Sequence, residues 1–198
     1  MIAREDITGA VLAGGMGRRM SADGAGLDKG LEPLRGRPLA AHVIERFAPQ
    51  VGPLIVNANR NRERYAAFGY PVVADSIEGF AGPLAGIEAC LARCRTPYLA
   101  TTPCDTPFIP RDLVSRMAQA IDRERVALAV ARTAGQAHPV FLLLSVSLHG
   151  SLRDFLATGR RKIDAWYAGF PTVEVDFDDD AAFSNINTPD ELSRHEAQ

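Results

Sequence analysis

The first residues suited to chemistry follow an apolar run near the N-terminus. The stretch GAVLAGGMGRRM (residues 9–20) passes from apolar side chains into a glycine-rich segment with two arginines. Glycines let backbone N–H groups come close to phosphate oxygens, and arginine offers a planar pair of donors to a phosphate. Lys29 adds a compact positive charge on the same long segment. We therefore interpret residues 13–30 as a triphosphate-binding loop with Arg19 and Lys29 as its cations.

Two other interpretations of this loop compete with that one. A dinucleotide-binding fingerprint requires a third glycine where Met20 stands, and it also requires an acidic residue at the end of the next strand. A tight strand-to-helix turn would explain the glycines but not the cations. The Walker phosphate-binding loop has no match in the chain.

Apolar runs alternate with helical patterns along the chain, which predicts a mostly parallel α/β sheet with helices on both faces. We expect one domain over residues 1–198. The spacing of apolar residues predicts helices over 38–47, 83–94 and 111–121, and a last helix that begins at the Thr188 capping box. The predicted strands cover residues 7–12, 54–58, 71–75, 98–102, 126–131 and 139–144.

Polar residues follow the predicted strands where a parallel sheet would bind its ligand. Asn57 and Asp75 end two of these strands, and Asp105 follows another after a short Pro-Cys step. Ligands of open α/β sheets bind at the carboxyl ends of the strands. Asp105 is a candidate magnesium ligand or a helix cap, and Asn57 and Asp75 are candidate nucleotide contacts or turn and cap residues. We interpret the acidic run 176–180 as a solvated turn.

Composition excludes several classes of protein. The net charge of −2 over 198 residues does not indicate a nucleic-acid-binding protein, and no apolar stretch reaches the roughly 18 residues of a membrane span. The three cysteines cannot all pair with one another, which favours a reduced, cytoplasmic compartment. Cys90 and Cys94 have no further cysteine or histidine near them in the sequence, so we expect them in the core rather than at a zinc site.

Several motifs together resemble the molybdenum cofactor guanylyltransferase family over nearly the whole chain. The opening segment contains LAGGMGRRM and then DKGLEPLRGRPL, and the later motifs occur in the same order and at similar spacing: VNANR, VVADS, GPLAGI, PCDTPFIP, HPVFLL and NINTPDEL. One departure is the longer insertion at residues 21–27, which leaves the identity of Lys29 clear but its path to the phosphates less defined.

The resemblance implies a Rossmann-like nucleotidyltransferase fold and a magnesium-dependent reaction. GTP and molybdopterin, or its molybdenum-loaded form, would give the guanine dinucleotide cofactor and pyrophosphate. Asp105 would ligate Mg²⁺, and Lys29 and Arg19 would stabilise phosphate charge. The implied GTP contacts are Leu12, Ala13, Gly14, Gly15, Lys29, Asn57, Asp75 and Asp105. On the pterin side the candidates are Gly82, Asn185 and Asn187. Molybdopterin-handling proteins and molybdoenzyme chaperones would be transient partners.

Two rival functions stay open at this point. A sister enzyme that uses CTP with the same pterin differs in a few base contacts that the sequence shows poorly. A non-catalytic nucleotide-binding module would keep the glycine-rich loop but would not need Lys29 and Asp105 together. Pyrophosphate release distinguishes a catalyst from a binding module, and nucleotide selectivity distinguishes the two enzymes.

Overall fold

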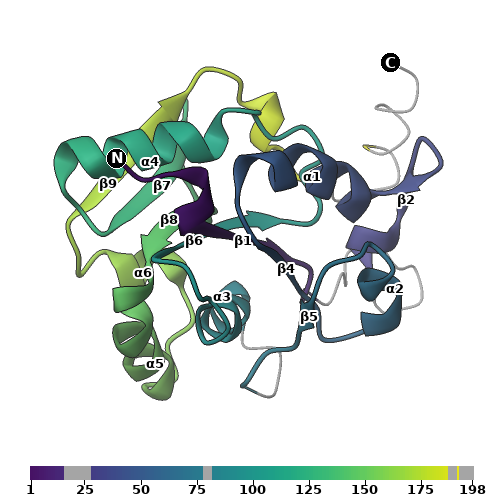
Figure 1. Cartoon of the computed structure of the whole chain (residues 1–198), viewed down its shortest axis with the longest axis horizontal. Helices are drawn as coiled ribbons and strands as arrows, with labels where there is room; N and C mark the ends of the chain where they lie inside the picture. The colour runs from purple at the N-terminus through teal and green to yellow at the C-terminus, as the bar shows by residue number, and fades with distance from the viewer. Residues whose placement is uncertain (16–27, 78–81, 187–190, 192–198) are drawn as a thin grey trace.

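A computed structural model of the chain describes residues 1–15, 28–77, 82–186 and 191. Within them, seven strands form one sheet in the order β5-β4-β1-β6-β8-β7-β9 (Figure 1). Four of its pairings are parallel, and only β8 runs against its two neighbours. The strands are β1 (Ile7–Leu12), β4 (Leu54–Asn57), β5 (Val72–Val73), β6 (Tyr98–Pro103), β7 (Leu128–Thr133), β8 (Gln136–Ser145) and β9 (Thr172–Phe177), with β2 (Pro33–Leu34) and β3 (Arg37–Pro38) in a separate ribbon.

Helices cover both faces of the large sheet, as the sequence predicts (Figure 1). One face carries α1 (Leu39–Phe47) and α4 (Leu113–Glu124), and the other carries α3 (Pro83–Leu91), α5 (His149–Ala157) and α6 (Ile163–Tyr167). The short α2 (Arg62–Ala66) follows β4 and contacts β5. Short 3-10 helices in the described residues span Arg4–Asp6, Lys29–Leu31, Ala48–Gln50, Val146–Leu148 and Ala181–Phe183. No helix in the described parts of the chain is long and apolar enough to cross a membrane.

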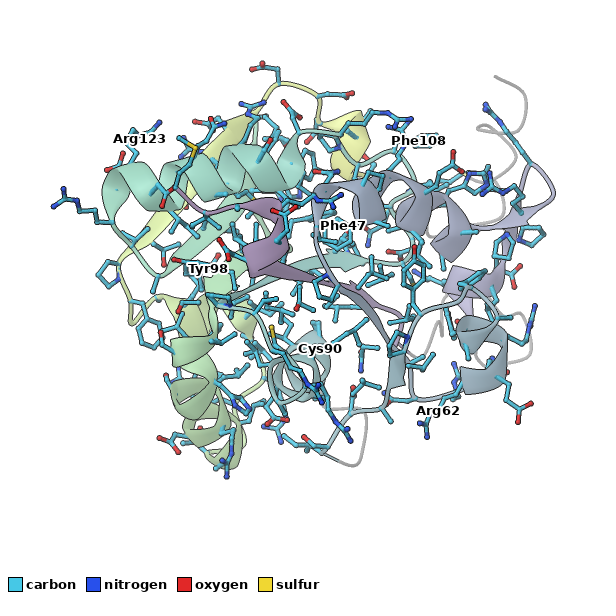
Figure 2. The ribbon with its side chains drawn as sticks, in the orientation of Figure 1. Phe47, Arg62, Cys90, Tyr98, Phe108 and Arg123 are labelled. Carbon is cyan, nitrogen blue, oxygen red and sulfur yellow. The ribbon has the colours of Figure 1, made fainter. Side chains whose placement is uncertain are left out.

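The two helical layers give the protein two apolar cores, one on each side of the sheet. All six residues of β1 are buried, which explains why this strand is mostly apolar and does not alternate apolar and polar residues. Phe47 lies between α1 and the sheet, and Cys90 lies between α3 and the opposite side of the sheet (Figure 2). Cys90 is fully buried, which confirms that it is a core residue, while Cys94 is half-buried and packs against the edge of the same core.

Strand register aligns the carboxyl ends of four neighbouring strands. Leu12, the last residue of β1, pairs with Asn57 at the end of β4 and with Pro103 at the end of β6, and Asn57 pairs with Val73 at the end of β5. The residues that lie two positions beyond these ends therefore meet along one edge of the sheet, and they are Gly14, Asn59, Asp75 and Asp105.

Several elements differ from the sequence prediction. The strand predicted over 71–75 is reduced to Val72–Val73, so Asp75 lies in the loop after it. The expectation of a solvated turn over 176–180 is wrong for its first two residues, which belong to β9. β7 and β8 form a hairpin whose turn residues, Ala134 and Gly135, both have positive φ. The last predicted helix begins outside the described residues.

Candidate active site

A cavity of about 440 Å³ lies at this carboxyl edge of the sheet. Every predicted site residue that the structure describes lines it: Leu12, Ala13, Gly14, Gly15, Lys29, Asn57, Asp75, Gly82, Asp105 and Asn185. Arg19, Asn187 and the insertion at 21–27 lie outside the described residues. Positions far apart in the sequence therefore share one cavity, which has the size of a small-molecule site.

Two asparagines hold the carboxylate of Asp75 from both sides. Asn57 Nδ2 donates to Asp75 Oδ1 at 2.8 Å, and Asn59 Nδ2 donates to Asp75 Oδ2 at 2.9 Å. Asn59 also accepts from the Asp75 backbone N–H at 2.9 Å and donates to the Gly14 carbonyl at 3.4 Å. The network joins the glycine-rich segment after β1 to the loop after β5.

The amide of Asn57, which lines the cavity, also makes hydrogen bonds within the protein. Its Nδ2 donates to the Val73 carbonyl at 3.1 Å as well as to Asp75, and the residue is only 2% exposed. Its N–H groups are thus directed into the protein, and the amide holds Asp75 in place. On its other side Asn57 packs against Gly86 of α3, where any Cβ would collide with the amide.

Lys29 and Asp105 form an ion pair inside the cavity. Lys29 Nζ lies 3.6 Å from Asp105 Oδ2, and the side chains are 18% and 10% exposed. Burial raises the pKa of the Asp105 carboxyl above its usual value, and Lys29 offsets only part of that effect. A carboxylate that is disfavoured by burial gains from binding a cation, so Asp105 is suited to a metal ion.

Segments from two other parts of the chain also line the cavity. Gly82, with φ of 80°, precedes Pro83 at the N-terminus of α3, and both line the cavity. A left-handed φ of this kind favours glycine. Asn185 also lines the cavity, and the next residue, Ile186, donates its backbone N–H to the Asp105 carbonyl at 2.9 Å. The C-terminal segment is thereby attached to the loop that carries Asp105.

Some neighbouring groups serve the fold rather than the chemistry. Burial raises the pKa of the Cys104 thiol well above its usual value, so the thiol is protonated and unsuited to act as a nucleophile. His138 Nε2 lies 2.6 Å from Thr133 Oγ1, and its ring stacks on Phe183. This position of His138 supports a structural role for it.

The donor groups of the cavity fit a metal ion that binds together with phosphates. Three carboxylates line the cavity, and both oxygens of Asp28 and of Asp75 already accept hydrogen bonds from protein groups. Among the described residues no group of three or more His, Cys, Asp or Glu side chains could hold a metal by itself. Mg²⁺ is commonly bound by one or two carboxylates, with phosphates and water in the remaining positions. Asp105 could supply that carboxylate.

Sequence reasoning missed two groups around this site. Asn59 follows a predicted strand, which places it at the sheet edge, but only its contacts with Gly14 and Asp75 reveal its role. Asp28 precedes Lys29 in the DKGLEPL motif, and its partners are Tyr65 of α2 and Asn61, the N-cap residue of that helix. In the sequence, only its position in the DKGLEPL motif could have indicated that Asp28 belongs to the site.

Comparisons with known proteins agree with this arrangement. A family model described as MobA-like NTP transferase domain matches residues 9–171. The molybdenum cofactor guanylyltransferase of Cupriavidus taiwanensis is 53% identical over 203 residues, covering 100% of both chains. Molybdopterin-guanine dinucleotide biosynthesis protein A from Archaeoglobus fulgidus superposes with a TM-score of 0.77 at 23% identity, covering 96% of this chain and 97% of that one. A Mycobacterium tuberculosis protein solved in complex with manganese superposes with a TM-score of 0.68 at 21% identity, covering 97% and 98%. The chain therefore belongs to the MobA-like NTP transferase family, among its molybdenum cofactor guanylyltransferases.

Proposed function

We propose that this enzyme transfers GMP from GTP to the terminal phosphate of molybdopterin, or of its molybdenum-loaded form, and releases pyrophosphate. The observation that carries the proposal is the buried Lys29–Asp105 pair, which faces the same cavity as the Gly14–Asn59–Asp75 network. The full-length identity of 53% to a guanylyltransferase supports the choice of reaction.

The reaction joins two anions, so charge neutralisation is the main task of the residues. A phosphate oxygen of the pterin attacks the α-phosphorus of GTP, and the bond from that phosphorus to the α,β-bridging oxygen breaks. The electron pair leaves with pyrophosphate. The attacking oxygen is already ionised near neutral pH, so no general base is needed, and catalysis depends on positioning and electrostatic stabilisation.

Each residue of the pair is assigned one part of this task. Lys29 is proposed to neutralise charge on the phosphates, together with Arg19. Asp105 is proposed to hold Mg²⁺, which would supply positive charge to offset the negative charge of the phosphates. Enzymes of this family generally use a divalent metal ion, and manganese in the M. tuberculosis relative supports a divalent site on this fold.

The remaining lining residues are proposed to hold the two substrates. Backbone groups of residues 12–15 would line the GTP phosphates and ribose. Asp75, held by Asn57 and Asn59, would accept hydrogen bonds from a guanine or ribose donor. Gly82 and Asn185, with Asn187, would lie toward the pterin. We further propose a cytoplasmic enzyme with transient contacts to molybdopterin-handling proteins and molybdoenzyme chaperones.

A thermal-shift titration tests the nucleotide half of this proposal. The protein is titrated with GTP, CTP, ATP and UTP, each with and without Mg²⁺. A ligand at about 100 times its Kd adds about 2.7 kcal/mol to the stability of the folded state. A Mg²⁺-dependent shift with GTP alone is expected. A shift selective for CTP would assign the chain to the cytidylyl reaction, and equal shifts with all four nucleotides would contradict guanine selection.

A further inference from the structure

Asp28, the residue before Lys29, is held by two side chains from the segment that begins α2. Tyr65 Oη donates to Asp28 Oδ1 at 2.5 Å, and Asn61 Nδ2 donates to Asp28 Oδ2 at 2.9 Å. Each carboxylate oxygen thus has its own donor. Hydrogen bonds to a charged group are stronger than neutral ones, so this contact fixes Asp28 firmly.

The backbone around Asn61 is arranged for this contact. Asn61 is the N-cap residue of α2, yet its side chain makes no capping hydrogen bond, although asparagine is a preferred cap. It instead has a left-handed φ of 48° and directs its amide to Asp28. Tyr65 is fully buried, so its hydroxyl depends on Asp28 as its acceptor.

Asp28 begins the tight turn that carries Lys29. Leu31 N–H donates to the Asp28 carbonyl at 2.9 Å, and Glu32 N–H donates to the Lys29 carbonyl at 3.1 Å. The next residue, Gly30, packs so closely that a Cβ there would collide with the Tyr65 hydroxyl and lie 2.9 Å from Cys104 Sγ. The turn is therefore enclosed by α2 on one side and by the residue before Asp105 on the other.

We propose that Tyr65 and Asn61 are positioning residues that act through Asp28 to hold Lys29 opposite Asp105. The inference rests on the proposed function, because it assigns the clamp of Tyr65, Asn61 and Asp28 to the orientation of a phosphate-binding lysine. Neither Tyr65 nor Asn61 lines the cavity, so any effect on turnover would pass through the turn at residues 28–30.

The test uses two conservative variants and a matched control in the full chain. Tyr65→Phe keeps the buried ring and removes only the hydroxyl, while Asn61→Gly removes the amide and tolerates the left-handed backbone. Tyr70→Phe is the control, because Tyr70 packs against the same core and no hydrogen bond of its hydroxyl is seen in the described residues. We expect Tyr65→Phe to lower kcat/KM for GTP about 10-fold and Asn61→Gly to lower it by a similar or smaller factor, with Tyr70→Phe within about 2-fold of wild type.

The same substitutions in a Lys29→Ala background separate positioning from a general loss of structure. If the clamp acts through Lys29, Tyr65→Phe lowers kcat/KM by less than about 2-fold when Lys29 is already absent. An equal reduction in both backgrounds would overturn the proposal, and so would a loss of thermal stability without any change in kcat/KM. Wild-type enzyme that releases no pyrophosphate from GTP in the presence of molybdopterin and Mg²⁺ would instead overturn the proposed function, and the positioning role with it.

Discussion

Lys29 Nζ lies 3.6 Å from Asp105 Oδ2 in a cavity where both side chains are largely shielded from water. In a pair of this kind the two partners are not equivalent. Burial disfavours the carboxylate, as the raised pKa of Asp105 shows, and the ammonium compensates for only part of this cost. Neutralising Asp105 should therefore maintain or raise stability, whereas neutralising Lys29 should lower it. Both substitutions should impair catalysis.

Substitution of Asp105 by asparagine should abolish most activity without destabilising the fold. The variant lacks the proposed Mg²⁺ ligand, so we expect kcat/KM to fall at least about 100-fold. Because the pKa of Asp105 is higher in the folded than in the unfolded protein, the stability of the wild type falls as pH rises from the unfolded-state pKa through the folded-state pKa. The amide does not carry this penalty, so metal-free Asp105→Asn should be at least as stable as wild type at neutral pH. Urea unfolding without metal at pH 7 and in acid measures this, and a variant that is markedly less stable at pH 7 would contradict the account.

Substitution of Lys29 by methionine should destabilise the protein as well as inactivate it. The Asp105 carboxyl would lose its nearest cation while it stays buried. We expect the free energy of unfolding to fall by about 1–3 kcal/mol at neutral pH. Lys162→Met is the control, because Lys162 is exposed and should change stability by less than about 0.5 kcal/mol. Equal effects of the two substitutions would show that the Lys29–Asp105 pair contributes nothing to stability.

Asn59 should matter for nucleotide binding through the carboxylate that it holds. Asn59→Ala removes hydrogen bonds to Asp75 and to the Gly14 carbonyl, and we expect KM for GTP to rise about 10-fold with a smaller change in kcat. Asn59→Asp should raise KM for GTP more than Asn59→Ala does near neutral pH, because it places a second negative charge against Asp75. Steady-state kinetics of both variants provides the check, and an aspartate variant more active than the alanine variant would argue against this role.

Gly86 should be intolerant of even one added methyl group. A Cβ at this position of α3 would collide with the Asn57 amide, so Gly86→Ala should displace Asn57 and cost about 1–3 kcal/mol of stability. A Cβ added to Gly150 in α5 would meet no other atom within 4 Å, so Gly150→Ala should stabilise the protein by about 0.5–1 kcal/mol. Thermal unfolding of both variants decides the point, since a neutral Gly86→Ala would mean that Asn57 can move freely.

The position of the site could be predicted from the sequence because it follows from strand ends. Asp105 and Asp75 come shortly after apolar runs, and parallel pairing brings the ends of such runs to one edge. The sequence could not show that Asp28 meets Tyr65, because that contact joins positions 37 residues apart and depends on how α2 packs. Nor could it show that Asn57 directs its N–H groups inward.

Two strands illustrate a similar limit in the fold. Among the described strands β9 lies at the edge of the sheet and pairs only with β7, and its sequence alternates acidic and apolar residues as it enters the acidic run. The charges of Glu174 and Asp176 favour a solvated turn, but both residues belong to β9, where they lie on its exposed side and form ion pairs with Arg132. β8 runs antiparallel because a two-residue turn at Ala134–Gly135 joins it to β7, and an alanine with positive φ is not a usual turn signal.

The most direct test of the central claim is pyrophosphate release by the wild-type enzyme with molybdopterin and Mg²⁺. GTP and CTP are supplied in parallel, and each reaction is repeated without the pterin and with Asp105→Asn enzyme. The account predicts pyrophosphate only when GTP, pterin, metal and an intact Asp105 are all present. Equal release from CTP, or undiminished release by the Asp105→Asn enzyme, would contradict it.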